Sequence, residues 1–385
     1  MISLYNFKRM AAVIFFLLSL PVVVAETGIT WTVQDLQSST ALWNVHFLDS
    51  LHGWACGDNG TVVRTYDGGT TWTNRRSGTS GSMRAVFFAD QTTGWAANDA
   101  GYIFKSTDRG STWAIQHTEA DAWFNDAWFF SDSVGLVVGG TSNGYDGLIC
   151  RTTNGGAGWT TQTHDDFSQI MCLSFINGDQ GWASGANDIA STSDGGASWG
   201  GAVTGGSGYI NEVFFLDGTT GFGVGRYGDI MKSSGGGWSM ITEAYKYNWM
   251  EGIAFPSYKY GLIAGERGFV ATSFDSGATW QSSFPHHPSS LDAAWFRAVC
   301  PVSPNLVWMV GDDGIIMQGR FYEYTGVWPL VKDMPRDEAG SPQTMALYDI
   351  KGFPVAVGHE LPPGIYFLKS RTGNKVNLCK IIVPE

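Results

Sequence analysis

One phrase returns along this chain at a nearly constant interval, and it constrains the fold more than any other feature. It reads Ser/Thr, any residue, Asp, any residue, Gly, a small residue, Ser/Thr and Trp, and its full copies end at Trp72, Trp113, Trp199 and Trp280. Degenerate copies end at Trp159, where Asn154 replaces the Asp, and at Trp238. A step of about 40 residues is the length of a four-stranded propeller blade, and one blade cannot bury its apolar face alone. The repeats are therefore expected to stack around a common core.

Each repeat has the same internal order, which predicts four short strands. An apolar strand is followed by a polar turn, a second strand such as Gly-Trp-Ala, a Gly-x-x-Gly turn, a third strand and the Asp phrase. Glycine at the turns supplies the positive φ that hairpins need. The repeats start near Leu42, Met83, Phe124, Ile170, Ile210, Met250 and Phe296.

The seventh repeat, from Phe296, has no Asp phrase, and the missing strand is found at the other end of the chain. Residues 28–32 read Gly-Ile-Thr-Trp-Thr, like the end of an Asp phrase. An outer strand supplied from there closes the ring and removes an exposed sheet edge. The sequence thus predicts an all-β, seven-bladed propeller of four-stranded blades over residues 26–325. Trp31 is expected to occupy the position that Trp72 and Trp113 hold in their blades.

The Asp phrases have a structural explanation. The carboxylate can accept hydrogen bonds from the N–H groups of its own turn, and the Trp can anchor neighbouring sheets. Each turn offers one Asp, whereas a Ca²⁺ loop needs several oxygen ligands, so no metal site is expected here. The predicted structural residues are Asp67, Asp108, Asn154, Asp194 and Asp275.

The two ends of the chain indicate export. Lys8 and Arg9 precede an apolar stretch, residues 11–24, which is typical of a secretory signal peptide cleaved after Ala25. Pro and Gly residues mark a linker over residues 326–343, followed by a small C-terminal β-domain over residues 344–385. The mature protein is expected to cross the periplasm and to act as a secreted or outer-membrane surface protein.

Charge and cysteine content exclude several classes of partner and cofactor. The formal net charge is −12, and an acidic protein repels nucleic-acid phosphates, so no nucleic-acid partner is expected. No cofactor is indicated. The cysteines are widely spaced without a CxxC pair, which favours buried thiols over disulfides or metal ligands. They are Cys56, Cys150, Cys172, Cys300 and Cys379.

The repeated phrase resembles the Asp-box, or bacterial neuraminidase repeat, of sialidases, xyloglucanases, sortilin-type receptors and photosystem II assembly factors. The fuller unit, with its apolar strand, Gly-Trp-Ala strand, glycine turn and Asp-box, most resembles the photosystem II assembly/stability factor-like propellers. The resemblance covers nearly all of residues 29–320 and implies a propeller that binds other molecules. Positive charge is sparse here, with 23 Lys and Arg against 35 Asp and Glu, so photosystem assembly itself is not implied.

The tail carries a second resemblance. Residues 347–352 read Leu-Tyr-Asp-Ile-Lys-Gly, residues 361–368 read Leu-Pro-Pro-Gly-Ile-Tyr-Phe-Leu, and residues 380–383 read Lys-Ile-Ile-Val. The order of these phrases resembles the C-terminal sorting domain of the type IX secretion system. This implies an interaction with secretion machinery. The alternative is a small β-module that the mature protein retains.

One face of the propeller is the candidate binding face. The start of each first strand and the turn between strands two and three lie at the same end of a blade, opposite the Asp-boxes. At this end, the second residue of each first strand varies among the blades while its neighbours stay apolar. These residues are Trp43, Arg84, Asn125, Met171, Asn211, Glu251 and Arg297. Turns and connections add Arg226, Tyr227, Glu266, Arg267, Tyr247 and Trp249. Such residues can bind a sugar by stacking or a protein through aromatic anchors, or can simply cover the blades around a solvated channel.

These observations predict a non-catalytic binding or scaffold propeller, monomeric, that recognises a protein or glycan at the cell surface. The alternative is a glycoside hydrolase that uses Glu251, Glu266 or Asp312, since paired carboxylates across a channel can hydrolyse a glycosidic bond. Sialidase propellers have six blades and xyloglucanases of this repeat class use two propellers, which favours the binding function.

Overall fold

The computed structural model describes residues 22–34, 36, 38–144, 146–164, 169–186, 188–200, 209–235, 237–242, 248–282, 294–328, 345–349, 354–355, 364–372 and 375–383. The chain divides into two compact units. One is Gly28–Tyr322, and the other combines Met1–Thr27 with Glu323–Glu385. Most of the predicted signal peptide, residues 1–21, lies outside the described residues. Within the described residues, no helix has the length and apolarity needed to cross a membrane.

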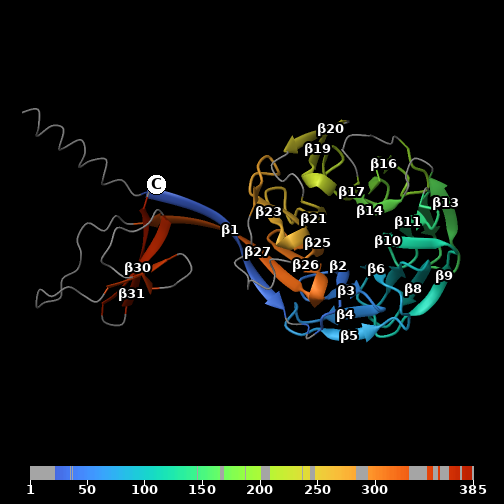
Figure 1. The fold of residues 1–385 in the computed structure, drawn as a ribbon, viewed down its shortest axis with the longest axis horizontal. Coiled ribbons are helices and arrows are strands. Elements are labelled where there is room, and N and C mark those ends of the chain that lie inside the picture. The colour runs from blue at the N-terminus through green and yellow to red at the C-terminus, as the bar shows by residue number, and fades with distance from the viewer. Residues whose placement is uncertain are drawn as a thin grey trace, which may run out of the picture. The chain divides into compact units, whose positions relative to one another are not determined.

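The larger unit is a ring of seven antiparallel sheets. The first strand of each sequence repeat lies nearest the centre of this ring (Figure 1). Blade 1 contains β2 (Leu42–Phe47), β3 (Gly53–Gly57), β4 (Thr61–Thr65) and β5 (Thr73–Arg76). Blade 2 contains β6 (Met83–Phe88), β7 (Gly94–Asn98), β8 (Tyr102–Ser106) and β9 (Ala114–Thr118). Blade 3 contains β10 (Ala122–Phe129), β11 (Gly135–Thr141), β12 (Gly147–Thr152) and β13 (Thr160–His164).

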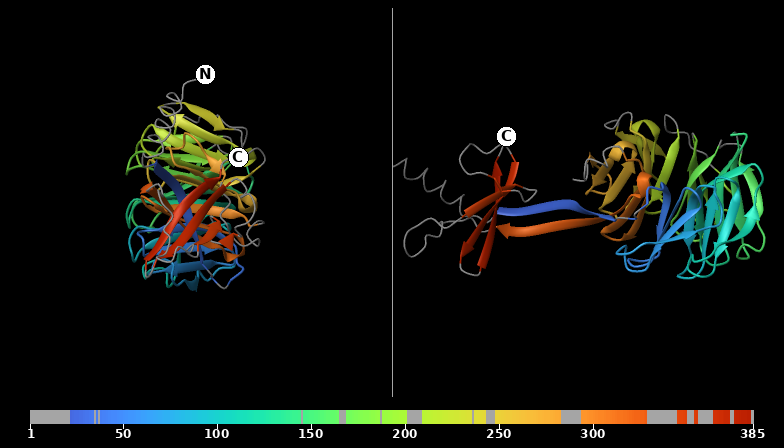
Figure 2. Two further views of the ribbon diagram at one scale, coloured as in Figure 1. Left: turned by 90° about the vertical axis from the view of Figure 1, so that its left-hand side faces the viewer. Right: turned by 60° about the horizontal axis from the view of Figure 1, so that its bottom comes forward.

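The remaining blades follow the same order around the ring, which Figure 2 shows from two further directions. Blade 4 contains β14 (Ile170–Phe175), β15 (Gly181–Gly185) and β16 (Ile189–Thr192). Blade 5 contains β17 (Ile210–Phe215), β18 (Thr220–Gly225), the turn η1 (Arg226–Gly228), β19 (Ile230–Ser234) and β20 (Trp238–Thr242). Blade 6 contains β21 (Met250–Ala254), β22 (Gly261–Gly265), η2 (Glu266–Gly268), β23 (Val270–Ser273) and β24 (Gln281–Ser282).

Blade 4 shows three strands within the described residues. An isolated bridge between Ser191 and Gly200 continues its sheet after the Asp-box, and residues 201–208 lie outside the described part of the chain. The prediction of seven blades built on a four-stranded plan is confirmed.

Blade 7 is closed by the N-terminal strand, as the sequence predicts. Its sheet has the order β1 (Val22–Gln34), β27 (Ile316–Trp328), β26 (Leu306–Gly311) and β25 (Phe296–Ser303), and η4 (Asp312–Gly314) joins β26 to β27. The Thr30 hydroxyl donates to the carbonyl oxygen of Arg320 at 3.3 Å. Trp31 packs, partly buried, against a cluster of buried core residues, as Trp72 and Trp113 do against their own clusters. This packing agrees with the position that the sequence predicts for Trp31.

Aromatic contacts between neighbouring blades recur in the core of the ring, beside many buried aliphatic side chains. Trp54 of blade 1 stacks on Phe88 of blade 2 at 3.7 Å between ring centroids, and Trp308 of blade 7 stacks on Phe47 of blade 1 at 4.8 Å. The Asp-box residue Trp72 meets both Phe47 and Trp308 edge-on, at 6.0 and 5.8 Å. Such pairs add about 0.5–1.5 kcal/mol each beyond the area they bury. The recurrence of these aromatic residues in the sequence therefore reflects one repeated contact between blades.

The Asp-boxes make the predicted turn hydrogen bonds. In blade 1, Asp67 accepts from the Thr65 hydroxyl at 2.8 Å, from the Thr71 N–H at 2.8 Å and from the Thr71 hydroxyl at 2.6 Å. Asp108, Asp194 and Asp275 accept the equivalent bonds in their own turns. Asn154 keeps the contacts to the Thr152 hydroxyl and to the N–H of Gly158. Gly68 and Gly69 take φ values of +66° and +85°, which explains the glycines of the phrase.

Four of the cysteines are free and buried, as expected: Cys56, Cys150, Cys172 and Cys300. In the smaller unit, β28 (Met345–Asp349), β29 (Pro354–Val355), β30 (Gly364–Thr372) and β31 (Lys375–Val383) form an antiparallel sheet in the order β29-β28-β30-β31. The predicted small C-terminal β-domain contains this sheet, whereas its boundary at residue 344 and its role in sorting stay predictions.

Candidate binding site at the channel mouth

Every blade carries a β-bulge near the start of its first strand. The pairing of the first strand with the second skips one residue, for example between Leu42 and Asn44 in blade 1. The skipped residues are Trp43, Arg84, Asn125, Met171, Asn211, Glu251 and Arg297. We call these seven residues the bulge ring. They are the residues that the sequence placed at the variable positions, and a bulge explains the variation because the extra residue is free of the ladder.

The first glycine of the Gly-x-x-Gly turns permits this bulge. A Cβ on Gly57 would lie 2.0 Å from the carbonyl oxygen of Ala41, the residue before the first strand, and Gly225 has the same relation to Tyr209 at 2.0 Å. The explanation by positive φ therefore holds only for the last glycine of the turn, such as Gly60 with φ +66°. In these blades the first glycine allows the close approach of two backbones. Asn98 occupies its position in blade 2.

The bulge ring surrounds the mouth of the central channel. All seven residues line one cavity of about 150 Å³. A second cavity of about 360 Å³ shares Asp126, Cys172 and Glu212 with the first and is lined farther on by His46, Phe87, Trp128 and Phe214. The channel thus has a narrow polar mouth and a wider aromatic interior.

The two ends of the blades differ as predicted. At the channel mouth, Trp43 Nε1 donates to Asp58 in the turn between strands two and three, at 2.7 Å. The Asp-box adjoins the opposite turn, where the Gly68 N–H donates to the carbonyl oxygen of Leu51 at 3.1 Å. The bulge ring and the Asp-boxes therefore lie at opposite ends of the blades.

Arginines at the mouth are stacked on aromatic rings. The guanidinium carbon of Arg84 lies 3.5 Å from the ring centroid of Trp43, and that of Arg297 lies 4.3 Å from the same centroid. Arg226 lies 3.9 Å from the ring of Tyr209 and 4.6 Å from that of Trp249. Stacking holds each guanidinium plane in place without occupying its N–H donors.

The arginines differ in their ionic partners. Arg297 forms a two-point ion pair with Asp312, with N···O distances of 3.0 and 3.2 Å. Arg84 makes neither a hydrogen bond nor an ion pair with any described residue, and its Coulombic neighbours Asp99 and Asp58 only oppose the lowering of its pKa by burial. A guanidinium keeps its charge at neutral pH in either environment. Arg84 thus presents a cation with free donors at the channel mouth.

Other predicted residues at the mouth support the fold. Asn125 donates to the carbonyl oxygen of Ile170 at 2.8 Å, and Asn211 donates to that of Met250 at 2.9 Å, so each ties its blade to the next. Glu251 accepts from Trp295 Nε1 at 3.2 Å, and burial raises the pKa of Glu251 although Arg297 opposes this.

The turn residues are divided between buried contacts and exposed positions. Glu266 accepts from the Trp249 N–H at 3.2 Å. Tyr227 and Arg267 adopt positive φ of 72° and 54° and are exposed, with Tyr227 52% accessible. Tyr247 lies outside the described residues. The structure therefore brings the bulge ring together with Arg226 and Glu266, while Tyr227 and Arg267 point to solvent around it.

Two carboxylates in the channel were not predicted from the sequence. Asp126 accepts from the Leu173 N–H of blade 4 at 2.8 Å, and Glu212 accepts from the Ile253 N–H of blade 6 at 2.9 Å. Burial raises the pKa of Asp126 to about 7 and that of Glu212 well above its usual value. Each directly follows a bulge residue, at a position that other blades fill with uncharged residues such as Ala85. The sequence does contain a signal for these two carboxylates, which is an acidic residue at an aligned position that is uncharged in the other blades. Such a residue indicates a specific partner, because a buried charge requires one.

Comparison with known proteins supports the propeller family that the sequence resembles. Residues 23–120 match the family model described as "Photosynthesis system II assembly factor YCF48". No curated protein matches this chain. Among solved structures, "YCF48 bound to D1 peptide" is 20% identical with a TM-score of 0.62, and the match covers 75% of this chain and 96% of that one.

Two further structures match over a similar length. YCF48 from Cyanidioschyzon merolae is 19% identical with a TM-score of 0.62, covering 75% of this chain and 98% of that one. The WD40 β-propeller domain of Doa1 is 11% identical with a TM-score of 0.60, covering 76% and 97%. At these identities the structures show a shared fold. The expected resemblance is confirmed: this chain is a seven-bladed propeller similar to the photosystem II assembly factor YCF48, with the family match itself lying in residues 23–120.

Proposed function

We propose that this protein is a non-catalytic scaffold that holds a segment of a partner protein at the mouth of its channel. The observation that carries the proposal is the bulge ring, where the same backbone device presents side chains of five types, Trp, Arg, Asn, Met and Glu, from the seven blades. Bulge residues gathered around one cavity are available for recognition where their side chains have no hydrogen-bonding or ionic partner among the described residues, as is the case for Arg84.

The free cation at the mouth indicates the chemistry of the segment. Arg84 is stacked on Trp43 and has no ionic partner among the described residues, so its N–H donors can pair with a carboxylate. The cavity of about 150 Å³ is smaller than the ~300 Å³ at which pockets for whole small molecules begin. It suits one acidic side chain or a chain terminus, not a folded domain. An extended acidic segment is therefore the proposed ligand.

A similar propeller supports this mode of binding. The structure described as "YCF48 bound to D1 peptide" contains a propeller of this kind with a peptide. We transfer to this chain the class of ligand, a peptide, and neither the partner nor the contact residues.

Selection of peptides with the complete mature protein tests the proposal. A displayed random-peptide library should yield ligands rich in Asp or Glu, or ligands that depend on a free C-terminal carboxylate. Arg84→Ala should weaken their binding at least tenfold by calorimetry. Arg76→Ala, an exposed arginine on the outer strand β5, should leave it unchanged and serves as the charge-matched control. Equal binding by both variants would overturn the proposal, and binding on a glycan array that needs Arg84 would assign the site to sugars.

A hydrolase remains the second candidate because of Glu251. Burial raises the pKa of this carboxyl group, which is the environment of a general acid. Against this function, Glu251, Glu266 and Asp312 each already hold a structural partner. A screen of glycoside substrates separates the two functions: turnover that Glu251→Gln or Glu266→Gln abolishes would replace the scaffold proposal.

We further propose that the protein acts at the cell surface after export. The charged and apolar segments of residues 1–25 and the phrases of residues 344–385 support Sec export followed by a type IX-like pathway. Residues 327–385 fused to a reporter should carry it to the surface of a type IX-competent host. A reporter that stays in the periplasm would contradict sorting and favour a retained β-module.

A further inference from the structure

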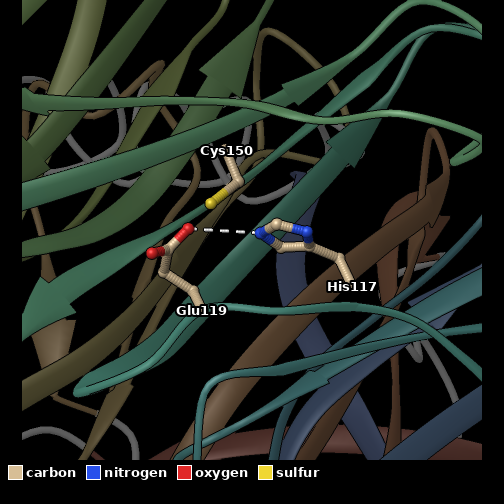
Figure 3. A group of neighbouring side chains, drawn as sticks. All are labelled: His117, Glu119 and Cys150. Carbon is tan, nitrogen blue, oxygen red and sulfur yellow. Dashed lines mark hydrogen bonds and ion pairs between the residues drawn. The ribbon is translucent and has the colours of Figure 1, made fainter.

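Three side chains of different chemistry meet between blades 2 and 3, away from the channel. His117 lies on β9, Glu119 lies just after this strand, and Cys150 lies on β12 of the next blade. Figure 3 shows them pointing toward one another, and their ligand atoms all lie within 4.8 Å of one another. His117 Nε2 and Glu119 Oε2 are 3.2 Å apart. The cluster therefore joins donor atoms from two neighbouring blades.

We propose that His117, Glu119 and Cys150 form a binding site for a divalent transition metal, with zinc as the preferred ion. Imidazole nitrogen, thiolate sulfur and carboxylate oxygen are the three protein ligands that zinc takes, and hard ions such as Mg²⁺ and Ca²⁺ disfavour sulfur. No metal site was predicted from the sequence, because the cysteines are widely spaced and no CxxC pair is present.

The distances suit coordination after a small adjustment. Bonds of ~2.0–2.3 Å in a tetrahedral site place ligand atoms roughly 3.3–3.8 Å apart. The nitrogen–oxygen pair is already at 3.2 Å, so only the sulfur must approach. The Thr161 hydroxyl donates to Glu119 Oε2 at 2.7 Å and lies 3.6 Å from Cys150 Sγ. It thus contacts two of the three proposed ligands, as residues around metal ligands commonly do.

The exposure of the ligand side chains and the proton on the Cys150 thiol both affect how the ion would bind. The side chains of His117 and Glu119 are 23% and 29% exposed, which leaves a path for the ion and a place for water as fourth ligand. Cys150 is buried, and this burial raises the pKa of its thiol to about 12. Metal binding therefore has to release the thiol proton to solvent, and its affinity should rise with pH.

The metal-ligand residues are not required by the blade fold, because other blades have different residues at the aligned positions. The position of Cys150, defined by its pairing with the second strand, holds Val63 in blade 1 and Phe104 in blade 2. The position of His117 holds Arg75 in blade 1. The cluster is specific to one blade interface, where a bound ion would link β9 to β12 and stabilise the contact between the two blades.

Cobalt titration tests the site on the complete protein, because a Co²⁺–thiolate bond gives a charge-transfer band in the near ultraviolet. The wild type should show this band, and Zn²⁺ should displace the cobalt and raise the melting temperature by several degrees. Cys150→Ala should lose the band. His117→Gln, a change at a partly exposed residue, should keep the fold and lower the affinity at least tenfold.

Cys56→Ala is the matched control, since Cys56 is another buried free thiol, in blade 1. It should keep both the band and the stabilisation by zinc. A wild-type protein without the band, or a band that survives in His117→Gln at unchanged affinity, would overturn the proposal. If Cys150→Ala does not fold, the His117→Gln comparison and the effect of zinc on the wild type still decide it.

Discussion

The substitution Asp126→Asn should change how the stability of the propeller depends on pH. The Asp126 carboxylate accepts two hydrogen bonds, each of 2.8 Å. One comes from the N–H of Leu173 in the neighbouring blade, and the other comes from the N–H of Ala127. Burial in the channel raises its pKa from 3.8 to about 7 although both hydrogen bonds oppose the shift. The folded protein therefore retains a proton at Asp126 over a pH range in which the unfolded chain has lost it.

The direction of the effect follows from proton linkage. Between pH 4 and 7 the folded state binds more protons than the unfolded state, so the free energy of unfolding falls as pH rises through this window. At about 1.4 kcal/mol for each pH unit, the loss reaches about 4 kcal/mol above pH 7. This is an upper bound, because Asp126 is partly accessible from the channel and water screens its charge.

Urea unfolding at pH 4.5 and pH 8 measures the effect. The wild type should lose stability toward pH 8. Asp126→Asn should reduce this loss by the part that Asp126 contributes, whereas the part from Glu212, whose pKa is also raised by burial, should remain. The variant should be less stable at pH 4.5 by about 1–2 kcal/mol, since its single amide oxygen serves two backbone donors less well than the carboxyl group.

An Asp-box residue gives a control of opposite sign. Hydrogen bonds from the Thr71 side chain and backbone lower the pKa of Asp67, so its contribution is present at neutral pH and lost as pH falls. Asp67→Asn keeps the turn, as Asn154 does in blade 3, and should reduce the loss of stability in acid. If Asp126→Asn showed the same dependence between pH 4.5 and 8 as the wild type, Asp126 would be ionised throughout and the argument from burial would be wrong.

Three further predictions test the architecture. Gly60→Ala should lower the free energy of unfolding by about 2–4 kcal/mol in urea titrations, because φ is +66° and a Cβ would lie 2.1 Å from the Thr79 carbonyl oxygen; an unchanged midpoint would contradict this. Asp275→Ala should cost about 1 kcal/mol through the lost bonds to Ser273 and Thr279, whereas Asp275→Asn should cost less. Deletion of residues 1–34 should expose the edge of β27 and produce aggregates in light scattering; a soluble monomer of wild-type stability would refute closure by β1.

Much of the candidate site could be predicted because the blades align with one another. The bulge ring appears in the sequence as a position that varies while its neighbours stay apolar. The sequence alone therefore predicts that Arg84, Glu251 and Arg297 lie on the same face. The bulge itself was not predicted, since strand pairing register is set by contacts between strands. Asp126 and Glu212 were missed because their hydrogen-bond partners lie on the next blade, at Leu173 and Ile253.

Spacing along the chain decided the fold class, the number of blades and the closing strand. A repeat of about 40 residues with Gly, Asp and Trp at constant offsets specifies turns and strands locally, and these signals do not depend on distant residues. The contacts between side chains of different blades are set by the closed ring. The contacts of Trp43 with Arg84 and with Arg297 bring together blades that are 1, 2 and 7 in chain order. The cluster of His117, Glu119 and Cys150 likewise forms only when blade 3 packs against blade 2. Such contacts depend on the curvature of the whole ring, which no single repeat contains.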